Sequence, residues 1–558
     1  MKRVALVLLA LSVLTFPLAA EKPADGPRSR LQLVEATIYE LQHALRTGLV
    51  TSEQLVQMYL ARIAAYDDAG PGVNAFIHIN ETALDEARER DAERRRGHKT
   101  HPLFGIPVLL KDNIDTADMP TTAGSVALEG SIPPDDAFIA QKLRDVGAII
   151  LGKATLTEFA NFIAIGMPSG YSSLGGYGFN PYDPRPLPVS DGRPVLTPGG
   201  SSSGSGIAVA ANLVAVAVGT ETSGSILSPG TANMDVGIKP TLGLVSRDGI
   251  LPITADQDTA GPLTRTVYDA AVLLGTLAGF DAADPATAAC LTPGNCFDDY
   301  TRFLNRHALR GARIAVPRVP YWNGFSTEQT QIMLNAIEAL RSEGAFVADP
   351  YEIPNQAAIT AFGICVSYPP PVTCSSVLMY GQKKDLNAYL AARQPAPVQT
   401  LADIIAFNIA FGPGALKYGQ AIFLAADQLD VSPGSADTAR YLADRAQDLA
   451  LTRTGLDAVF NGPDGIEGTA DDFDAILFPR NGGAGAPAKA GYPSIVVPGG
   501  FTPPVGAVVN PIPFGVTFSG PAFSEPKLLA IAYAFEQATK HRVPPESTPP
   551  LPSDLVRR

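Results

Sequence analysis

Apolar residues recur at helical spacing in several long stretches of the chain, with charged or polar residues between them. This spacing places the apolar side chains on one face of a helix that packs against a core. Ser52 stands where a helix N-cap is expected, and Glu53 adds negative charge to the first turn. The helices that this pattern predicts are residues 31–49, 52–66, 83–96, 136–146, 267–277, 329–342, 404–411, 438–453 and 525–539.

Short apolar runs stand between these helices and predict buried strands. They lie at residues 102–112, 148–151, 236–253, 313–316 and 492–501, and as LDAVF and DAILF on either side of residues 461–474. Because strands and helices alternate along the chain, the pattern predicts an α/β fold built on a sheet.

Residues 199–229 combine two kinds of pattern. Glycine- and serine-rich turns at 199–205 and 222–225 flank an apolar run at 207–218, which predicts a buried helix and strand. Successive backbone N–H groups in such turns can converge on an anionic oxygen. Residues 161–198 show little periodicity and are rich in Gly, Pro, Tyr and Asn. A loop of that length in a compact domain is usually functional, so we expect it to wall a site.

Composition excludes two broad classes. The chain has 558 residues, of which 46% are hydrophobic and 17% charged, so it can bury a large core and is not a disordered protein. Its formal net charge is −13, and no long basic stripe occurs. The sequence therefore gives no support for a nucleic-acid partner.

The start of the chain predicts export. Residues 1–20 have a basic beginning, an apolar run from Val4 to Phe16, and small residues at Ala19 and Ala20. This is the pattern of a secretory signal peptide, and it is too short to span a bilayer. We therefore expect a periplasmic or extracellular protein with no stable membrane association after the signal is removed.

The cysteines and one acidic loop raise two further questions. In an oxidising compartment, the sequence spacing favours the local pairs Cys290 with Cys296 and Cys365 with Cys374. Residues 461–474 (NGPDGIEGTADDFD) are rich in carboxylates, which suit Ca²⁺, but their spacing is not that of an EF-hand. A solvated, glycine-rich hairpin is the favoured interpretation, and we expect no metal and no cofactor.

A serine nucleophile needs a partner that takes its proton. None of the six histidines lies in a glycine-rich or otherwise site-like stretch. Residues 200–204 match the G-x-S-x-G pattern of an esterase, with Ser202 at its centre, but LTP rather than a strand precedes it. A P-loop and a His-Glu-x-x-His zinc helix are both absent from the sequence.

Taken together, the motifs resemble the amidase signature family, and the resemblance extends over roughly residues 31–544. It implies a single amidase domain over residues 21–558, in which helices cover both faces of a mixed central β-sheet. The motifs that carry it are GIPVLLKDNID around Lys111, LTEFANF at 156–162, GGSSSGS at 199–205, GTETSGSI at 219–226, KPTLGLVSRDGILPI at 239–253, QDTAGPLTRTVYDA at 257–270 and SEPKLLAIAYAFEQAT at 524–539.

The resemblance implies a Ser-Ser-Lys triad in place of Ser-His-Asp. The nucleophile falls on Ser225, the bridging serine on Ser201, which follows a cis peptide bond to Gly200, and the base on Lys111. A lysine base must be neutral, which requires its pKa to fall from about 10.4 to near 7. Burial at the end of the apolar run before Lys111 would lower it, and Asp112 would face the other way if the run is a strand.

Two further groups are expected around the triad. Backbone N–H groups of Thr222, Ser223, Gly224 and Ser225 are placed to stabilise an oxyanion. The resemblance puts Asn161 beside the substrate, although an asparagine that caps a turn is an equally good interpretation.

The implied function is hydrolysis of an amide through an acyl-enzyme. GTETSGSI, ANF and SRDGILPI look most like bacterial peptide amidases, which release ammonia from C-terminally amidated peptides. Leu227 and Ser223 depart from the Arg and Gly that many members carry, which leaves open a preference for aryl or acyl amides. Two hypotheses of a different kind are a secreted esterase that uses Ser202 and a secreted binding protein on an amidase scaffold.

Overall fold

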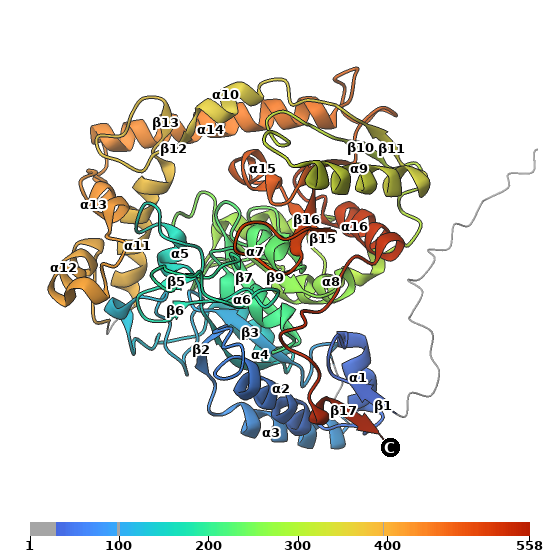
Figure 1. Cartoon of the computed structure of the whole chain (residues 1–558). Helices are drawn as coiled ribbons and strands as arrows, with labels where there is room; N and C mark the ends of the chain where they lie inside the picture. The colour runs from blue at the N-terminus through green and yellow to red at the C-terminus, as the bar shows by residue number, and fades with distance from the viewer. Residues whose placement is uncertain (1–29, 98–100, 394–395, 558) are drawn as a thin grey trace, which may run out of the picture.

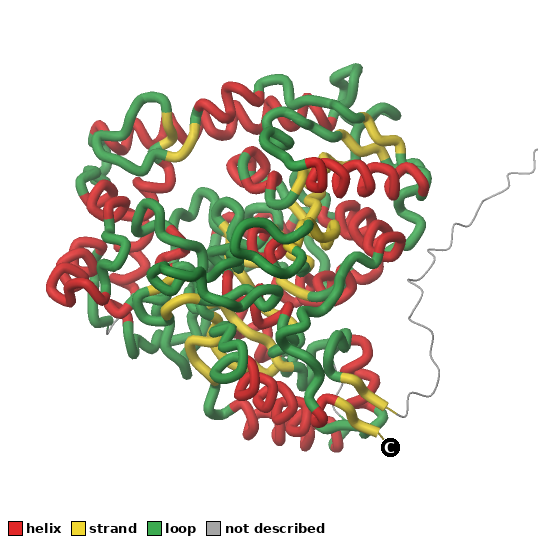
Figure 2. The backbone as a smooth tube through the Cα atoms, viewed as in Figure 1, coloured by secondary structure: helices red, strands yellow, loops and turns green. Residues whose placement is uncertain are grey.

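A computed structural model describes residues 30–97, 101–393 and 396–557. The predicted signal peptide, residues 1–20, lies outside the described residues. In Figures 1 and 2 the strands run through the middle of the molecule, and most helices lie around them.

Within the described residues, eleven strands form one mixed sheet. The strands β7, β3 and β4 are parallel neighbours, whereas β9 runs antiparallel to β7. The order across the sheet is β11 (Phe346–Ala348), β10 (Arg313–Ala315), β14 (Ala475–Pro479), β16 (Ile512–Ser519), β15 (Ser494–Thr502), β8 (Val236–Lys239), β9 (Thr259–Thr264), β7 (Val216–Glu221), β3 (Pro107–Lys111), β4 (Ile149–Ala154) and β2 (Phe76–Ile79).

Shorter strands form separate pairs. These are β1 (Arg30–Gln32) with β17 (Leu555–Arg557), β5 (Tyr171–Ser172) with β6 (Gly176–Tyr177), and β12 (Gly363–Ile364) with β13 (Cys374–Ser375).

Helices cover both faces of the sheet, which confirms the expected fold class. The α-helices in the described part of the chain are α1 (Ile38–Arg46), α2 (Ser52–Tyr66), α3 (Ala83–Arg95), α4 (Phe138–Asp145), α5 (Glu158–Asn161), α6 (Ser203–Ala210), α7 (Leu227–Ala232), α8 (Val267–Leu277), α9 (Thr327–Ser342), α10 (Gln356–Ala361), α11 (Val377–Ala392), α12 (Leu401–Phe411), α13 (Ala421–Asp427), α14 (Ala436–Phe460), α15 (Ala486–Ala490) and α16 (Glu525–Thr539).

Several local expectations are wrong. The helix predicted over residues 31–49 is only α1, which begins at Ile38, and residues 31 and 32 belong to strand β1. Thr51, not Ser52, is the N-cap of α2: its side chain accepts the N–H of Gln54, and the Gln54 side chain accepts the N–H of Thr51. LDAVF is not a strand but the end of α14, because Leu456, Val459 and Phe460 continue a buried helical face. Residues 461–474 therefore link a helix to β14 and do not form the predicted hairpin.

The parallel strands β7, β3 and β4 are buried on both faces. Every residue of β3, β4 and β7 is buried, as expected for parallel strands between layers of helices. Burial of such apolar strands contributes about 25 cal/mol per Å² of apolar surface and dominates the stability of this region. Lys111 and Lys153, both fully buried, are the charged exceptions in β3 and β4.

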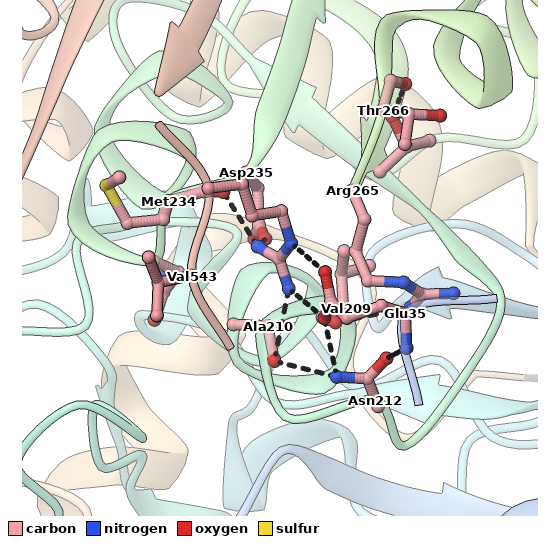
Figure 3. Close-up of polar contacts among 12 residues, drawn as sticks. Glu35, Val209, Ala210, Asn212, Met234, Asp235, Arg265, Thr266 and Val543 are labelled. Carbon is pink, nitrogen blue, oxygen red and sulfur yellow. Dashed lines mark hydrogen bonds and ion pairs between the residues drawn. The ribbon is translucent and has the colours of Figure 1, made fainter. Parts of the chain in front are cut away.

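The beginning and end of the described chain are joined through ion pairs of buried and partly buried side chains. Arg542 donates to both carboxylate oxygens of Glu35, at 2.8 and 3.0 Å, and to Asp235 at 3.1 Å. Glu35, Asn212 and Asp235 gather around this contact in Figure 3. Arg62 donates to Asp554 at 2.6 Å, with both side chains fully buried.

Both predicted local disulfides, Cys290–Cys296 and Cys365–Cys374, are present. The described residues contain no group of three or more His, Cys, Asp or Glu side chains that could hold a metal ion. Over the same residues, every helix is too short or too polar to cross a membrane.

Candidate active site

Lys111 lies at the carboxyl end of β3, between β7 and β4, and its side chain is fully buried. Its Nζ lies 2.8 Å from Ser201 Oγ, 2.8 Å from Thr220 Oγ1 and 3.2 Å from the Thr220 carbonyl oxygen. The structure therefore joins Lys111 and Ser201, which are ninety positions apart in the chain.

Burial lowers the pKa of Lys111 from 10.5 to about 7, while the negative charges of Asp258 and Glu221 oppose the fall. Asp112, the residue after β3, points away: its carboxylate lies 3.7 Å from Lys153 and accepts a hydrogen bond from Thr122. Among the described residues, Lys111 therefore has hydroxyl and carbonyl partners but no carboxylate in direct contact.

Ser201 lies in the turn that precedes α6. Its peptide bond to Gly200 is cis, as the resemblance implies. The turn is packed tightly, since a Cβ on Gly200 would lie 2.6 Å from Thr157 Oγ1, and the Ser201 carbonyl accepts the N–H of Thr157 at 3.0 Å. Only glycine fits at position 200 without displacing Thr157.

Ser225 ends the second turn, between β7 and α7. The N–H of Ser202 donates to the Ser225 carbonyl at 3.1 Å, which holds the two serine-rich turns together. Exposure increases from Lys111 (0%) to Ser201 (1%) to Ser225 (8%). Ser225 is therefore the most exposed of the three residues.

Glu221, at the end of β7, fixes the turn that carries Ser225. Its carboxylate accepts the N–H groups of Gly224 and Ile226, each at 2.7 Å, and of Leu227 at 3.0 Å. The Gly224 N–H is therefore not available to an oxyanion, contrary to the sequence-based expectation. In the described chain the N–H groups of Thr222, Ser223 and Ser225 have no such acceptor.

Two neighbouring residues hold Thr222. Its hydroxyl donates to Asp258, and its carbonyl accepts from Gln257 Nε2 at 2.6 Å. Burial raises the pKa of Asp258 to about 6. Glu221 and Asp258 together fix the backbone direction of the residues expected to stabilise the oxyanion.

Asn161 makes no direct hydrogen bond to the expected catalytic residues. It is exposed, has a φ of 71°, and makes no hydrogen bond to Lys111, Ser201 or Ser225. The preceding residue, Ala160, lines a small cavity that also reaches Thr222 and Asp258. The backbone before Asn161 therefore borders the site, while its side chain faces solvent.

Ser202 does not have the geometry of an esterase nucleophile. It is fully buried, donates to the Thr220 carbonyl at 3.0 Å and accepts the Thr220 N–H at 3.2 Å. No strand of the described chain leads directly into α6, which a nucleophile elbow requires.

Four residues of the site carry no signal that sequence reasoning used. Thr220 contacts Lys111, Asn113 contacts Thr220, Glu221 braces the turn, and Asp258 holds Thr222. All four lie within quoted motifs: Asn113, Thr220 and Glu221 are close in sequence to Lys111 or Ser225, and Asp258 is near the start of QDTAGPLTRTVYDA. That proximity is the signal that could have found them.

The comparisons with known proteins agree with this architecture. The sequence model of the Amidase family matches residues 54–529. The chain belongs to the amidase signature family and is an amide-hydrolysing enzyme.

Particular relatives are similar along nearly their whole length. An Arabidopsis thaliana protein named "Probable amidase" is 38% identical, covering 93% of each chain. The crystal structure of native peptide amidase from Stenotrophomonas maltophilia is 42% identical, with a TM-score of 0.79, and the match covers 92% of this chain and 99% of that one. An amidase family protein from Bacillus anthracis is 34% identical, with a TM-score of 0.80 and coverage of 92% and 93%.

Proposed function

We propose that the protein is an exported peptide amidase that converts a C-terminal peptide amide into a carboxylate and ammonia. The observation that carries the mechanism is the fully buried Lys111, whose pKa is lowered to about 7 and whose Nζ lies 2.8 Å from Ser201 Oγ. A neutral amine in that position can take a proton that a serine hydroxyl passes to it.

Ser225 Oγ attacks the amide carbonyl carbon. Its proton moves to Ser201 Oγ, while the Ser201 proton moves to Lys111 Nζ. The carbonyl oxygen becomes an oxyanion, which backbone N–H groups of the turn stabilise. Collapse of this intermediate breaks the C–N bond, and the proton returns from Lys111 through Ser201 to the leaving nitrogen, so that ammonia departs.

An ester between the acyl group and Ser225 remains. Water then attacks the ester carbonyl, Ser201 and Lys111 remove a proton from that water in the same way, and Ser225 leaves with its proton restored. One water is consumed, and the products are the carboxylic acid and the free enzyme. Lys111 is neutral at the start and at the end of the cycle.

The substrate class rests on the 42% identity to the peptide amidase of Stenotrophomonas maltophilia over 92% of this chain. Export rests on the sequence pattern of residues 1–20. The two disulfides support it, because such bonds persist in oxidising compartments.

Ammonia release by the purified mature protein tests the function. The substrates are C-terminally amidated peptides, simple aliphatic amides and aryl amides. Ser225→Ala serves as the blank, and Ser205→Ala serves as a matched control, since Ser205 is a buried serine of α6 whose hydroxyl donates to the Val218 carbonyl.

Release from peptide amides by the wild type and by Ser205→Ala, with none from Ser225→Ala, is the expected result. Turnover of aryl or aliphatic amides alone would retain the amidase mechanism and remove the peptide assignment. Wild-type turnover by Ser225→Ala would overturn the mechanism. Loss of activity in Ser202→Ala, with Lys111→Ala active, would favour the esterase hypothesis.

A further inference from the structure

Thr220 contacts the amine of Lys111 through two of its atoms. It occupies β7, beside β3, and offers Lys111 Nζ two oxygen atoms: its hydroxyl at 2.8 Å and its carbonyl at 3.2 Å. Ser201 Oγ, at 2.8 Å, is the third contact. Two of the three polar contacts of the amine therefore come from one residue.

The numbers of hydrogen-bond donors and acceptors on Lys111 Nζ and on Thr220 indicate where each hydrogen lies. A neutral amine has two N–H groups and one lone pair. The Thr220 carbonyl can only accept, so it takes one N–H. The Thr220 hydroxyl accepts the second N–H when its own hydrogen turns to Asn113 Oδ1, at 3.4 Å. The lone pair of Lys111 is then left facing Ser201 Oγ.

We propose that Thr220 is a positioning residue that turns the lone pair of Lys111 toward Ser201 Oγ. In this arrangement the hydroxyl hydrogen of Ser201 points to Lys111, and an oxygen lone pair of Ser201 is free for the proton of Ser225. The proton path then has one direction, from Ser225 inward. The inference rests on the proposed Ser225–Ser201–Lys111 mechanism.

Thr220 is itself fixed from two sides. Ser202 Oγ donates to its carbonyl and accepts its N–H, as described above. Asn113 Nδ2 lies 3.1 Å from the Thr220 hydroxyl and 3.2 Å from the Leu251 carbonyl. Ser202 therefore anchors the backbone of Thr220, and Asn113 orients its hydroxyl. This gives the buried Ser202 hydroxyl a structural role instead of a nucleophilic one.

The charged groups around Lys111 are few. Glu221, at the end of β7, and Asp258, next to the start of β9, raise its pKa, and burial lowers it. Asp112, which follows β3, is turned to Lys153 of β4. The Thr220 hydroxyl is an acceptor that favours the protonated amine, so its removal lowers the pKa of Lys111 further.

The test compares Thr220→Val, which keeps the shape and removes the hydroxyl, with Thr220→Ser, which keeps the hydroxyl. Thr276→Val is the matched control, because Thr276 is a buried threonine of α8 whose hydroxyl donates to the Val272 carbonyl. The readouts are kcat, KM and the pH profile of kcat/KM for ammonia release, with circular dichroism to confirm folding.

We expect Thr220→Val to lose about 10- to 100-fold in kcat with little change in KM, since only the proton transfer is misdirected. The acid limb of its kcat/KM pH profile should lie at lower pH than that of the wild type, because the pKa of Lys111 is lower. A loss of packing alone would not produce this shift. Thr220→Ser and Thr276→Val should match the wild type.

Three outcomes distinguish a failure of the Thr220 inference from a failure of the proposed Ser225–Ser201–Lys111 mechanism. Wild-type kcat and acid limb in Thr220→Val, with Ser225→Ala and Lys111→Met inactive, would overturn the inference alone. A Thr220→Ser as impaired as Thr220→Val would also overturn it, because the hydroxyl would then not matter. Activity in Lys111→Met would overturn the proposed function itself.

Discussion

Two buried lysines, Lys111 and Lys153, stand on adjacent parallel strands and have opposite surroundings. In the register of β3 and β4, Lys153 is opposite Leu110, one residue before Lys111. Both side chains are fully buried, and burial lowers the pKa of both. Lys153 Nζ lies 3.7 Å from Asp112 and 2.8 Å from Thr121 Oγ1, whereas Lys111 meets only hydroxyl and carbonyl oxygens of the described residues.

The difference shows that two buried lysines on neighbouring strands have different partners, and in the proposed mechanism only Lys111 acts as a base. A carboxylate in contact stabilises the ammonium form, so Lys153 is held as one half of a buried ion pair. Without that carboxylate, burial makes the neutral form of Lys111 accessible near pH 7. In the proposed mechanism Lys111 acts as a base because it is buried, contacts no carboxylate of the described chain and lies 2.8 Å from Ser201 Oγ.

The largest effect should come from Lys111→Met, which removes the proposed base and keeps the apolar stem. We expect kcat for ammonia release to fall by about 10³- to 10⁴-fold, because the proton of Ser225 loses its acceptor. Lys153→Met is the matched control and should retain wild-type kcat in the folded fraction. Circular dichroism gives the folded fraction of each variant. If both variants lose the same activity after correction for this fraction, the distinction between Lys111 and Lys153 is wrong.

Stability should rank the two lysines in the opposite order. Lys153→Met leaves the Asp112 carboxylate buried without its cation, which we expect to cost about 3–5 kcal/mol of unfolding free energy. Urea denaturation followed by circular dichroism measures it. An unfolding free energy equal to that of the wild type would mean that Asp112 and Lys153 are not a stabilising pair.

The smallest effect concerns the cost of keeping Lys111 neutral. Between about pH 7 and 10.5 the unfolded chain binds a proton at Lys111 that the folded chain does not, so stability rises with pH across this window. Lys111→Met removes this cost and should be about 2–4 kcal/mol more stable than the wild type at pH 7.

That advantage should shrink as pH rises toward 10.5, above which the lysine is neutral in both states. Unfolding free energies of wild type and Lys111→Met at pH 6, 8 and 10 measure the trend. A difference that stays constant with pH would show that Lys111 is protonated in the folded protein, which would remove the distinction from Lys153.

Sequence reasoning assigned Lys111, Ser201 and Ser225 from motifs that resemble the amidase signature family, and the structure joins two of them, Lys111 and Ser201, by a hydrogen bond. It could not find the role of Thr220, since a threonine on a strand carries no chemical signal until its neighbours across the sheet are known. The Gly224 N–H failed as a prediction for a related reason: the Glu221 carboxylate folds back onto the turn that follows it.

In the fold, too, features set by neighbouring residues were predicted, and features set by residues far apart in sequence were not. The bounds of α2, α8 and α16 were predicted residue for residue, because their apolar spacing is unambiguous. LDAVF was misassigned, since five apolar-rich residues fit a strand as well as a helix end, and only the preceding turns of α14 decide between them. Strand order required contacts across hundreds of residues, which periodicity does not contain.

The contacts that join the two ends of the described chain bear on how the molecule reaches its native state. Glu35 and Arg542 are 507 positions apart, and Arg62 and Asp554 are 492 apart. Loops of that length are slow to close, and until they close Glu35 and Arg62 lack their ion-pair partners Arg542 and Asp554. A nascent chain that lacks residues 540–557 therefore cannot complete its interior. Folding is therefore completed only after this segment has been synthesised. A chain that is not yet fully folded can pass through an export channel, which the proposed export requires.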